Sequence, residues 1–203
     1  WRNKDCKHEF DLNRCKKCGE SRLFPFQVEG SRFLETALAV NNGGAIFDEM
    51  GLGKTIQALA YLKYHNENQP VIFVLKSAIK VQWWKECIKW LGPEWLGQVI
   101  DSAKTFIIPQ APCYFVSFDI FTKRKTKSGS MTGKSVDDFA HCKTVVIDEC
   151  QQIKNPDSAR TQMIRRLCKG KKVIALSGTP WKNRGGEFFS ILNMLSPMKF
   201  PSH

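Results

Sequence analysis

Residues 48–55 read DEMGLGKT, and this stretch decides the expected fold. An apolar run at 45–47 precedes it, and a helical pattern of apolar residues begins after it at Ile56. A strand, a glycine-rich turn and a helix N-terminus in this order are the context of a phosphate-binding loop. Backbone N–H groups and the helix dipole favour an anion there. Lys54 adds a positive charge for the outer phosphates, and the Thr55 hydroxyl can ligate Mg²⁺.

The loop departs from the general phosphate-loop pattern at one position. G-x-x-x-x-G-K-[ST] requires glycine five places before Gly53, and this sequence has Asp48 there. The second half of an NTPase site follows the apolar run at 144–147, where Asp148 and Glu149 stand together. An acidic residue at the end of such a strand holds Mg²⁺, and a neighbouring glutamate can orient and deprotonate the attacking water. Phosphoryl transfer depends mainly on positioning and charge neutralisation, so one lysine, one hydroxyl and two carboxylates suffice for the core of such a site.

Apolar runs alternate with helical patterns along the chain, which predicts an α/β fold with a doubly wound parallel sheet. Strands are expected at 45–47, 71–75, 98–100, 113–116, 144–147 and 173–176. Helices are expected from residue 23 to about 40 and at 56–62, 79–91, 136–139, 157–168 and 187–195. The expected buried residues are Phe26, Phe33, Leu34, Ala37 and Leu38 in the first helix and Val81, Trp84, Ile88 and Leu91 in the helix at 79–91. The candidate chemistry falls at carboxyl ends of strands, where open α/β sheets bind ligands.

Composition excludes some classes of protein. The chain has 203 residues, of which 42% are hydrophobic, enough for one α/β domain and a small appendage. Its net charge of +12 indicates either a basic soluble surface or a polyanion partner, and nucleic acid is the expected one. No apolar run reaches about 18 residues and no signal peptide is visible, so no membrane partner is expected. We expect an intracellular, reducing compartment, cytoplasm or nucleus, and a fragment of a longer protein.

A small metal module is predicted at residues 1–22. The spacing C-x-H-x6-C-x2-C is formed by Cys6, His8, Cys15 and Cys18. Four ligands of this kind favour tetrahedral Zn²⁺, and so short a segment needs metal to fold. The alternative is a coincidence of free cysteines and a surface histidine. Whether the module contacts DNA or caps the domain at 23–203 stays open.

A basic segment at 122–130 lies between two expected strands. Its charged residues are Lys123, Arg124, Lys125 and Lys127. Loops in this position commonly carry binding groups, although a charge run can also be a solvated surface. DNA contact is therefore one of two readings of this segment.

Five motifs in order resemble the Swi/Snf-type ATPases of helicase superfamily two. They are LFPFQ at 23–27 with Glu29-Gly30, DEMGLGKT, Gln82-Trp83, DECQQIKN at 148–155 and LSGTP at 176–180. Asp48, which departs from the general loop pattern, is typical of that family. The resemblance implies the first of two RecA-like P-loop NTPase lobes, a parallel sheet flanked by helices. It also implies a DNA-dependent ATPase that couples ATP hydrolysis to movement on duplex DNA.

The resemblance also implies a role for each matching residue. ATP would be bound by Gln27, Asp48, Glu49, Met50, Gly51, Leu52, Gly53, Lys54 and Thr55. Asp148 and Thr55 would hold Mg²⁺, and Glu149 would activate water. DNA contact and coupling would fall to Ser77, Gln151, Ser177 and Thr179.

The sequence departs from the family in places that bear on its activity. Gln151 replaces the usual histidine, and because glutamine can hydrogen-bond in both directions we expect altered but retained coupling. Lys76-Ser77 replaces the usual Cys-Pro, which adds a positive charge, and 181–183 differ after LSGTP. The family's second lobe supplies arginines worth on the order of 10³–10⁵ in rate, so this lobe alone is expected to be nearly inactive. The alternatives are a strand-separating DNA or RNA helicase and a zinc nucleic-acid-binding protein with a degenerate NTPase scaffold.

Overall fold

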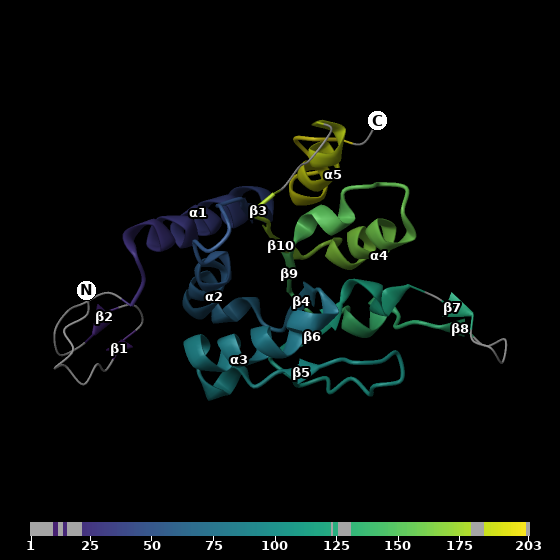
Figure 1. Ribbon diagram of the computed structural model, residues 1–203, viewed down its shortest axis with the longest axis horizontal. Helices are drawn as coiled ribbons and strands as arrows, with labels where there is room; N and C mark the ends of the chain where they lie inside the picture. Colours follow the sequence, from purple (N-terminus) through teal and green to yellow (C-terminus); the bar gives the residue numbers. More distant parts are fainter. Residues whose placement is uncertain are drawn as a thin grey trace.

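The computed structural model describes residues 10–11, 14–15, 22–122, 124–125, 131–179 and 185–201 (Figure 1). Its centre is a parallel sheet of six strands in the order β3-β10-β9-β4-β6-β5. The strands are β3 (Gly43–Ile46), β4 (Val71–Leu75), β5 (Gln98–Val99), β6 (Cys113–Ser117), β9 (Thr144–Asp148) and β10 (Lys172–Leu176). The strands predicted from apolar runs are all present, with bounds shifted by at most two residues at either end.

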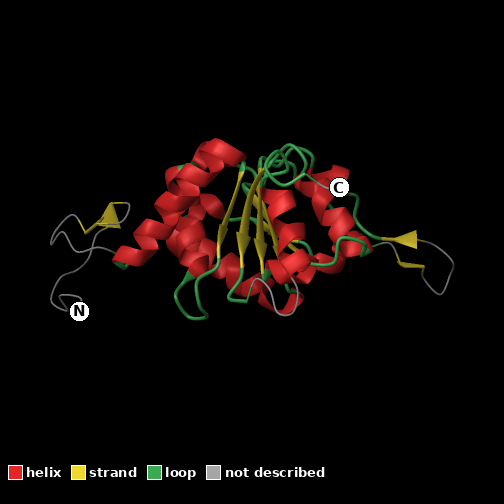
Figure 2. Cartoon of the chain, turned by 90° about the horizontal axis from the view of Figure 1, so that it is seen from above, coloured by secondary structure: helices red, strands yellow, loops and turns green. Residues whose placement is uncertain are grey.

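Helices cover both faces of this sheet (Figure 2). The five α-helices among the described residues are α1 (Pro25–Asn41), α2 (Lys54–Tyr64), α3 (Lys80–Leu91), α4 (Ala159–Cys168) and α5 (Gly185–Leu195). Leu34, Leu59 and Trp83 from the first three helices pack with one set of strand residues. Ile164 and Ile191 from the last two pack with the alternate set. Successive side chains of a strand point to opposite faces, so two cores form from one sheet.

The remaining turns and small strands are short. The 3₁₀ helices are η1 (Asn66–Asn68), η2 (Ser77–Ile79), η3 (Pro93–Trp95), η4 (Phe118–Phe121), η5 (Val136–Phe139) and η6 (Cys150–Ile153). The helix predicted at 136–139 is thus a single 3₁₀ turn. Two antiparallel pairs lie outside the main sheet, β1 (Phe10–Asp11) with β2 (Arg14–Cys15) and β7 (Arg124–Lys125) with β8 (Met131–Thr132).

The register of the sheet brings the ends of three strands level. Leu176 of β10 lies opposite Ile46 of β3 on one side and opposite Asp148 of β9 on the other. The segments that follow these strands therefore leave from the same edge of the sheet. This edge is where open α/β sheets place ligand sites.

Close packing explains the two glycines that begin β3. A Cβ on Gly43 would lie 2.2 Å from the backbone oxygen of Leu195, and one on Gly44 would lie 3.1 Å from side-chain atoms of Ala37 and Leu34. The preceding Asn42 is left-handed, with φ of 59°, and ends α1. The sharp turn from α1 into β3 therefore needs these residue types.

Two predictions about buried faces are wrong. Phe26 and Phe33 of α1 are 41% and 54% exposed, because the buried line of α1 is Gln27, Ser31, Leu34 and Leu38. Val81 of α3 is 53% exposed, and Trp83 rather than Trp84 is the fully buried tryptophan, because the helix turns Lys80, Trp83, Cys87 and Leu91 inward.

Some predicted features fall wholly or partly outside the described residues. Cys6, His8 and Cys18 are not described, whereas the backbone of Cys15 ends β2. Within the described residues no group of three metal-ligating side chains occurs. Lys123 and Lys127 are likewise not described, and Arg124 and Lys125 form β7. No helix in the described part of the chain is long and apolar enough to cross a membrane.

Candidate functional site

The glycine-rich loop connects β3 to the first turn of α2. Gly51 and Gly53 have φ of +89° and +76°, values that L side chains rarely adopt, so the loop can turn sharply only with glycine there. Lys54 is the first residue of α2, and its Nζ donates to the backbone oxygens of Asp48 and Glu49, each at 2.8 Å. An ammonium has three donors, so the third remains for an anion at the helix N-terminus.

Two glutamines hold the loop from outside. The Asp48 carboxylate accepts a hydrogen bond of 2.8 Å from Gln57 Nε2, and Gln57 is fully buried. This bond gives a physical reason for aspartate where the general loop pattern has glycine. Gln27 Nε2 donates to the oxygen of Leu52 at 3.3 Å, while its Oε1 accepts from the backbone N–H of Phe24 at 3.1 Å. The amide of Gln27 is therefore fixed beside the loop.

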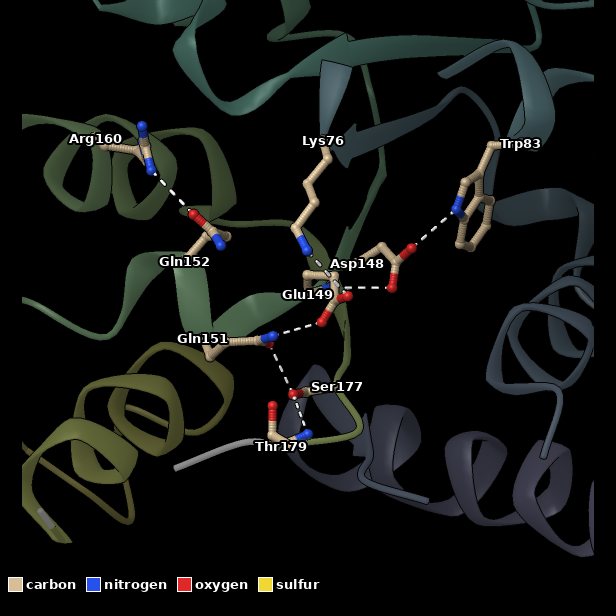
Figure 3. Close-up of polar contacts among 9 residues, drawn as sticks. All are labelled: Lys76, Trp83, Asp148, Glu149, Gln151, Gln152, Arg160, Ser177 and Thr179. Atoms are coloured by element: carbon tan, nitrogen blue, oxygen red, sulfur yellow. Dashed lines mark hydrogen bonds and ion pairs between the residues drawn. The ribbon is translucent and has the colours of Figure 1, made fainter. Parts of the chain in front are cut away.

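Asp148 ends β9 in the middle of the sheet. Its Oδ2 accepts a hydrogen bond of 3.0 Å from the indole of Trp83, and its Oδ1 accepts one of 2.9 Å from the backbone N–H of Glu149 (Figure 3). Burial raises the pKa of Asp148 and the Trp83 bond opposes that rise. A nearby cation stabilises the charged form of a buried carboxylate whose pKa is raised. The environment of Asp148 therefore suits a Mg²⁺ ligand.

Glu149 has a left-handed backbone, with φ of 55°. Its Oε2 accepts from Gln151 Nε2, and its Oε1 lies 3.2 Å from Lys76 Nζ. Burial alone would raise the pKa of Glu149, but the Gln151 hydrogen bond and the Lys76 ammonium outweigh it and hold the pKa below its usual range. Glu149 is therefore a carboxylate with a partner on each oxygen.

A chain of hydrogen bonds leads from Glu149 to the segment after β10. Gln151 donates to Glu149 and its Oε1 accepts a bond of 2.8 Å from Ser177 Oγ. Ser177 Oγ in turn accepts from the backbone N–H of Thr179 at 3.0 Å (Figure 3). Gln151 thus hydrogen-bonds in both directions, as a donor to Glu149 and as an acceptor from Ser177.

The segment after β10 also contacts the loop. A Cβ on Gly178 would lie 2.9 Å from Met50 Cγ and 3.5 Å from Lys54 Nζ. Glycine leaves room for this close approach, whereas a larger residue would push the Met50 side chain aside. The structure thus brings the loop lysine, the acidic pair and the Ser177–Thr179 segment together at one edge of the sheet.

Other predicted residues lie apart from this cluster. Ser77 is exposed at the start of η2, after the neighbouring strand β4. Arg124 and Lys125 lie on the β7–β8 pair outside the main sheet. The sequence reasoning missed two residues, Gln57 as the partner of Asp48 and Lys76 as the partner of Glu149. The sequence signals for Lys76 are its position directly after a buried strand and its positive charge where the family usually has cysteine.

The residues present fit a nucleoside triphosphate with Mg²⁺. Lys54 and the amides at the start of α2 offer donors for phosphate oxygens. Asp148 offers a carboxylate oxygen for the metal, and Thr55, the second residue of α2, offers a hydroxyl. Anion donors and hard oxygen ligands therefore lie on the same edge of the sheet.

Comparisons with known proteins point to one family. The family model described as SNF2-related domain matches residues 26–203. The DNA annealing helicase and endonuclease ZRANB3 of Mus musculus is 30% identical over 184 residues, which cover 89% of this chain and 16% of that protein. A SWI/SNF-related matrix-associated actin-dependent regulator of chromatin subfamily A-like protein 1, from Bos taurus, is 31% identical over 197 residues, 95% of this chain and 19% of that protein.

A solved structure agrees with the sequence comparisons. The Sulfolobus solfataricus SWI2/SNF2 ATPase core in complex with dsDNA matches with a TM-score of 0.69 and 25% identity, over 90% of this chain and 37% of that chain. The chain thus spans less than a fifth of these curated relatives and about a third of that core. The match to the family model covers most of the chain, and its residues 26–203 contain every group of the cluster described above. The chain belongs to the SNF2-related domain family.

Proposed function

We propose that this chain is the ATP-binding lobe of a DNA-dependent ATPase that couples hydrolysis to movement along duplex DNA. The observation that carries the proposal is the cluster at the edge of the sheet, where the loop with Lys54 meets Asp148 and Glu149. Family membership supports ATP as the substrate, and the match to an ATPase core in complex with dsDNA supports duplex DNA as the partner. The proposed location is the cytoplasm or nucleus.

Each residue of the cluster has a proposed part in the reaction. Lys54 and the amides of residues 51–55 bind and orient the phosphates. Mg²⁺, held by Asp148 and Thr55, would neutralise charge on the phosphate oxygens. Glu149 orients the attacking water and accepts its proton. Gln27, fixed against Leu52, reads the base.

The relay from Glu149 through Gln151 to Ser177 is the proposed link between hydrolysis and DNA. Movement of either end changes the hydrogen bonds of the other, because Gln151 binds both at once. Thr179, whose backbone N–H binds Ser177, extends the link by one residue. A second RecA-like lobe in the same full-length protein would close over this edge of the sheet.

The proposed function is tested by the nucleic acid that stimulates ATP turnover. Purified full-length protein should hydrolyse ATP faster with duplex DNA than with single-stranded DNA or RNA. Its affinity for duplex DNA should fall steeply with salt and vary little with sequence, because the contacts are to phosphates. A clear preference for RNA would contradict the proposal, and strand separation would favour the helicase alternative.

The isolated lobe is expected to be a poor enzyme. Residues 1–203 alone should hydrolyse ATP on the order of 10³–10⁵ times more slowly than the full-length protein, because arginines from a second lobe would be missing. Single-turnover assays on both proteins measure the ratio. Rapid DNA-stimulated hydrolysis by the lobe alone would show that the active site needs no second lobe.

The β7–β8 segment is a proposed binding surface for the DNA backbone. Changing Lys123, Arg124, Lys125 and Lys127 to alanine should weaken duplex binding and reduce the slope of log K against log salt by about 0.9 for each phosphate that the variant no longer binds. A matched control removes four exposed charges from the main body, at Arg32, Lys85, Lys104 and Lys169. An equal change of slope in both variants would mean that only net charge matters.

The N-terminal module is proposed to bind zinc through Cys6, His8, Cys15 and Cys18. Purified protein should contain about one zinc ion per chain, and the Cys15→Ser variant should lose it. The other five cysteines are buried, and burial raises their pKa, for example that of Cys142 to about 12. They should react slowly with thiol reagents, so rapid thiol release on chelation reports the module alone. Protein without zinc would end this proposal.

A further inference from the structure

Lys76 stands between the acidic pair and the segment that begins η2. It follows β4 directly, and its backbone caps the turn that starts at Ser77. Its side chain turns toward the active-site edge and reaches Glu149, with Nζ 3.2 Å from Oε1 (Figure 3). Two residues that lie 73 positions apart in the sequence are therefore joined across the ends of neighbouring strands.

The ion pair competes with the proposed work of Glu149. A general base must offer an oxygen to the water whose proton it takes. One oxygen of Glu149 already accepts from Gln151, and the other is paired with the Lys76 ammonium. While the ion pair with Lys76 persists, Glu149 is restrained.

Lys76 is placed so that another anion could draw it away. Its side chain is 47% exposed, whereas that of Glu149 is 28% exposed. Ser77 and Ala78, the next residues, are exposed as well, so the ammonium lies beside an accessible surface. Partly exposed ion pairs of this kind are weak, and a phosphate oxygen is a strong competitor for a lysine.

We propose that Lys76 is a positioning residue that restrains Glu149 and releases it when a phosphate of duplex DNA binds the Lys76 ammonium. The inference rests on the proposed function, since it assigns to one ion pair a share of the stimulation by DNA. It adds a direct route between DNA and the catalytic glutamate, separate from the relay through Gln151. Both side chains are partly exposed at the edge of the sheet, so removing the charge of Lys76 should cost little stability.

The test compares Lys76→Met and Lys76→Arg with the unchanged full-length protein. Lys76→Met should raise kcat without DNA about threefold, the change expected from removing a weak ion pair, and leave KM for ATP unchanged. At saturating duplex DNA its kcat should equal that of the unchanged protein, so the stimulation ratio falls about threefold. Lys76→Arg keeps the charge and should restore the low rate without DNA. Lys76→Met should also reduce the salt slope of duplex binding by about 0.9, because one phosphate is no longer bound by a lysine.

A matched control is Lys85→Met, which removes the same charge from an exposed position on α3 and should change neither rate. Thermal unfolding of each variant checks that the fold is kept. Unchanged rates in Lys76→Met would overturn the inference while leaving the proposed function intact. An equal fall of kcat with and without DNA would overturn it too, because Lys76 would then act on the reaction itself. An unchanged protein that shows no stimulation by DNA would overturn both.

Discussion

Changing Lys54 to alanine in the full-length protein is expected to reduce DNA-stimulated ATP turnover by roughly 10²–10³-fold or more. Lys54 is the first residue of α2, where the helix dipole and backbone N–H groups already favour an anion. The attraction between Lys54 and the phosphate would be strongest in the transition state, when the phosphate oxygens gain negative charge. The variant should therefore lose more in kcat than in ATP affinity. The variant would also lack the bonds from Lys54 Nζ to Asp48 and Glu49, which should loosen the loop.

The control for this variant separates an effect on the chemistry from an effect on the fold. The two lost hydrogen bonds are worth about 1 kcal/mol each, so the midpoint of thermal unfolding should fall by no more than roughly 4–8 °C. Lys63→Ala, near the other end of α2, removes the same charge and should keep full activity. ATP turnover that survives in Lys54→Ala would contradict the assignment of the loop and favour a degenerate NTPase scaffold.

The strands of this fold could be predicted from sequence because a parallel sheet covered by helices buries both faces. Val71–Leu75 is a run of five apolar residues that the structure buries completely, and the strand has the predicted bounds. The order of the strands could not be predicted in the same way. Pairing of β3 with β10 joins residues about 130 apart, and no local pattern encodes that pairing.

The buried faces of the helices were harder to predict because some buried residues are polar or hydrogen-bond to the candidate site. In α1, Gln27 is 6% exposed because its amide bonds the loop, whereas Phe33 is 54% exposed. In α3, Trp83 rather than Trp84 is fully buried because its ring packs on Phe73, with centroids 5.3 Å apart, while its N–H reaches Asp148. Hydrophobic periodicity favours Trp84, whereas the contact with Phe73 and the position of the carboxylate select Trp83.

The candidate site was partly predictable for a related reason. The sequence places Asp148 and Glu149 directly after an apolar strand and Lys54 directly after a glycine turn. It therefore predicts both the chemistry of these residues and their position at the ends of strands. The hydrogen bonds of Gln57 and Lys76 could not be predicted. Gln57 reaches Asp48 only because the loop between them turns back, and Lys76 reaches Glu149 from 73 residues away. Asp48 shows the difference clearly. The family resemblance marks aspartate as typical at this position. The structure gives the physical reason, which is a hydrogen bond of 2.8 Å from the buried Gln57.

Glu149→Gln in the full-length protein is expected to lose hydrolysis and keep ATP binding. The change preserves the size of the side chain, and its carbonyl oxygen can still accept from Gln151, so the relay to Ser177 should persist. It removes the carboxylate that takes the proton from water, a contribution of typically 10²–10⁴-fold. Single-turnover hydrolysis should therefore fall by about that factor. ATP affinity measured by fluorescent-analogue displacement should stay within about twofold, since Glu149 is proposed to act on the attacking water and not to bind phosphate.

The matched control is Glu35→Gln, an exposed glutamate of α1 that lies 3.7 Å from His65. It removes the same charge and should leave hydrolysis and binding unchanged. Glu149→Gln also breaks the ion pair to Lys76, which should cost no more than about 1 kcal/mol of stability because both side chains are partly exposed. Because Glu149→Gln should bind ATP without hydrolysing it, this variant should remain on duplex DNA with the affinity of the ATP-bound state. Full hydrolysis in Glu149→Gln would instead mean that another group activates water, and Glu149 would then serve only to position Lys76 and Gln151.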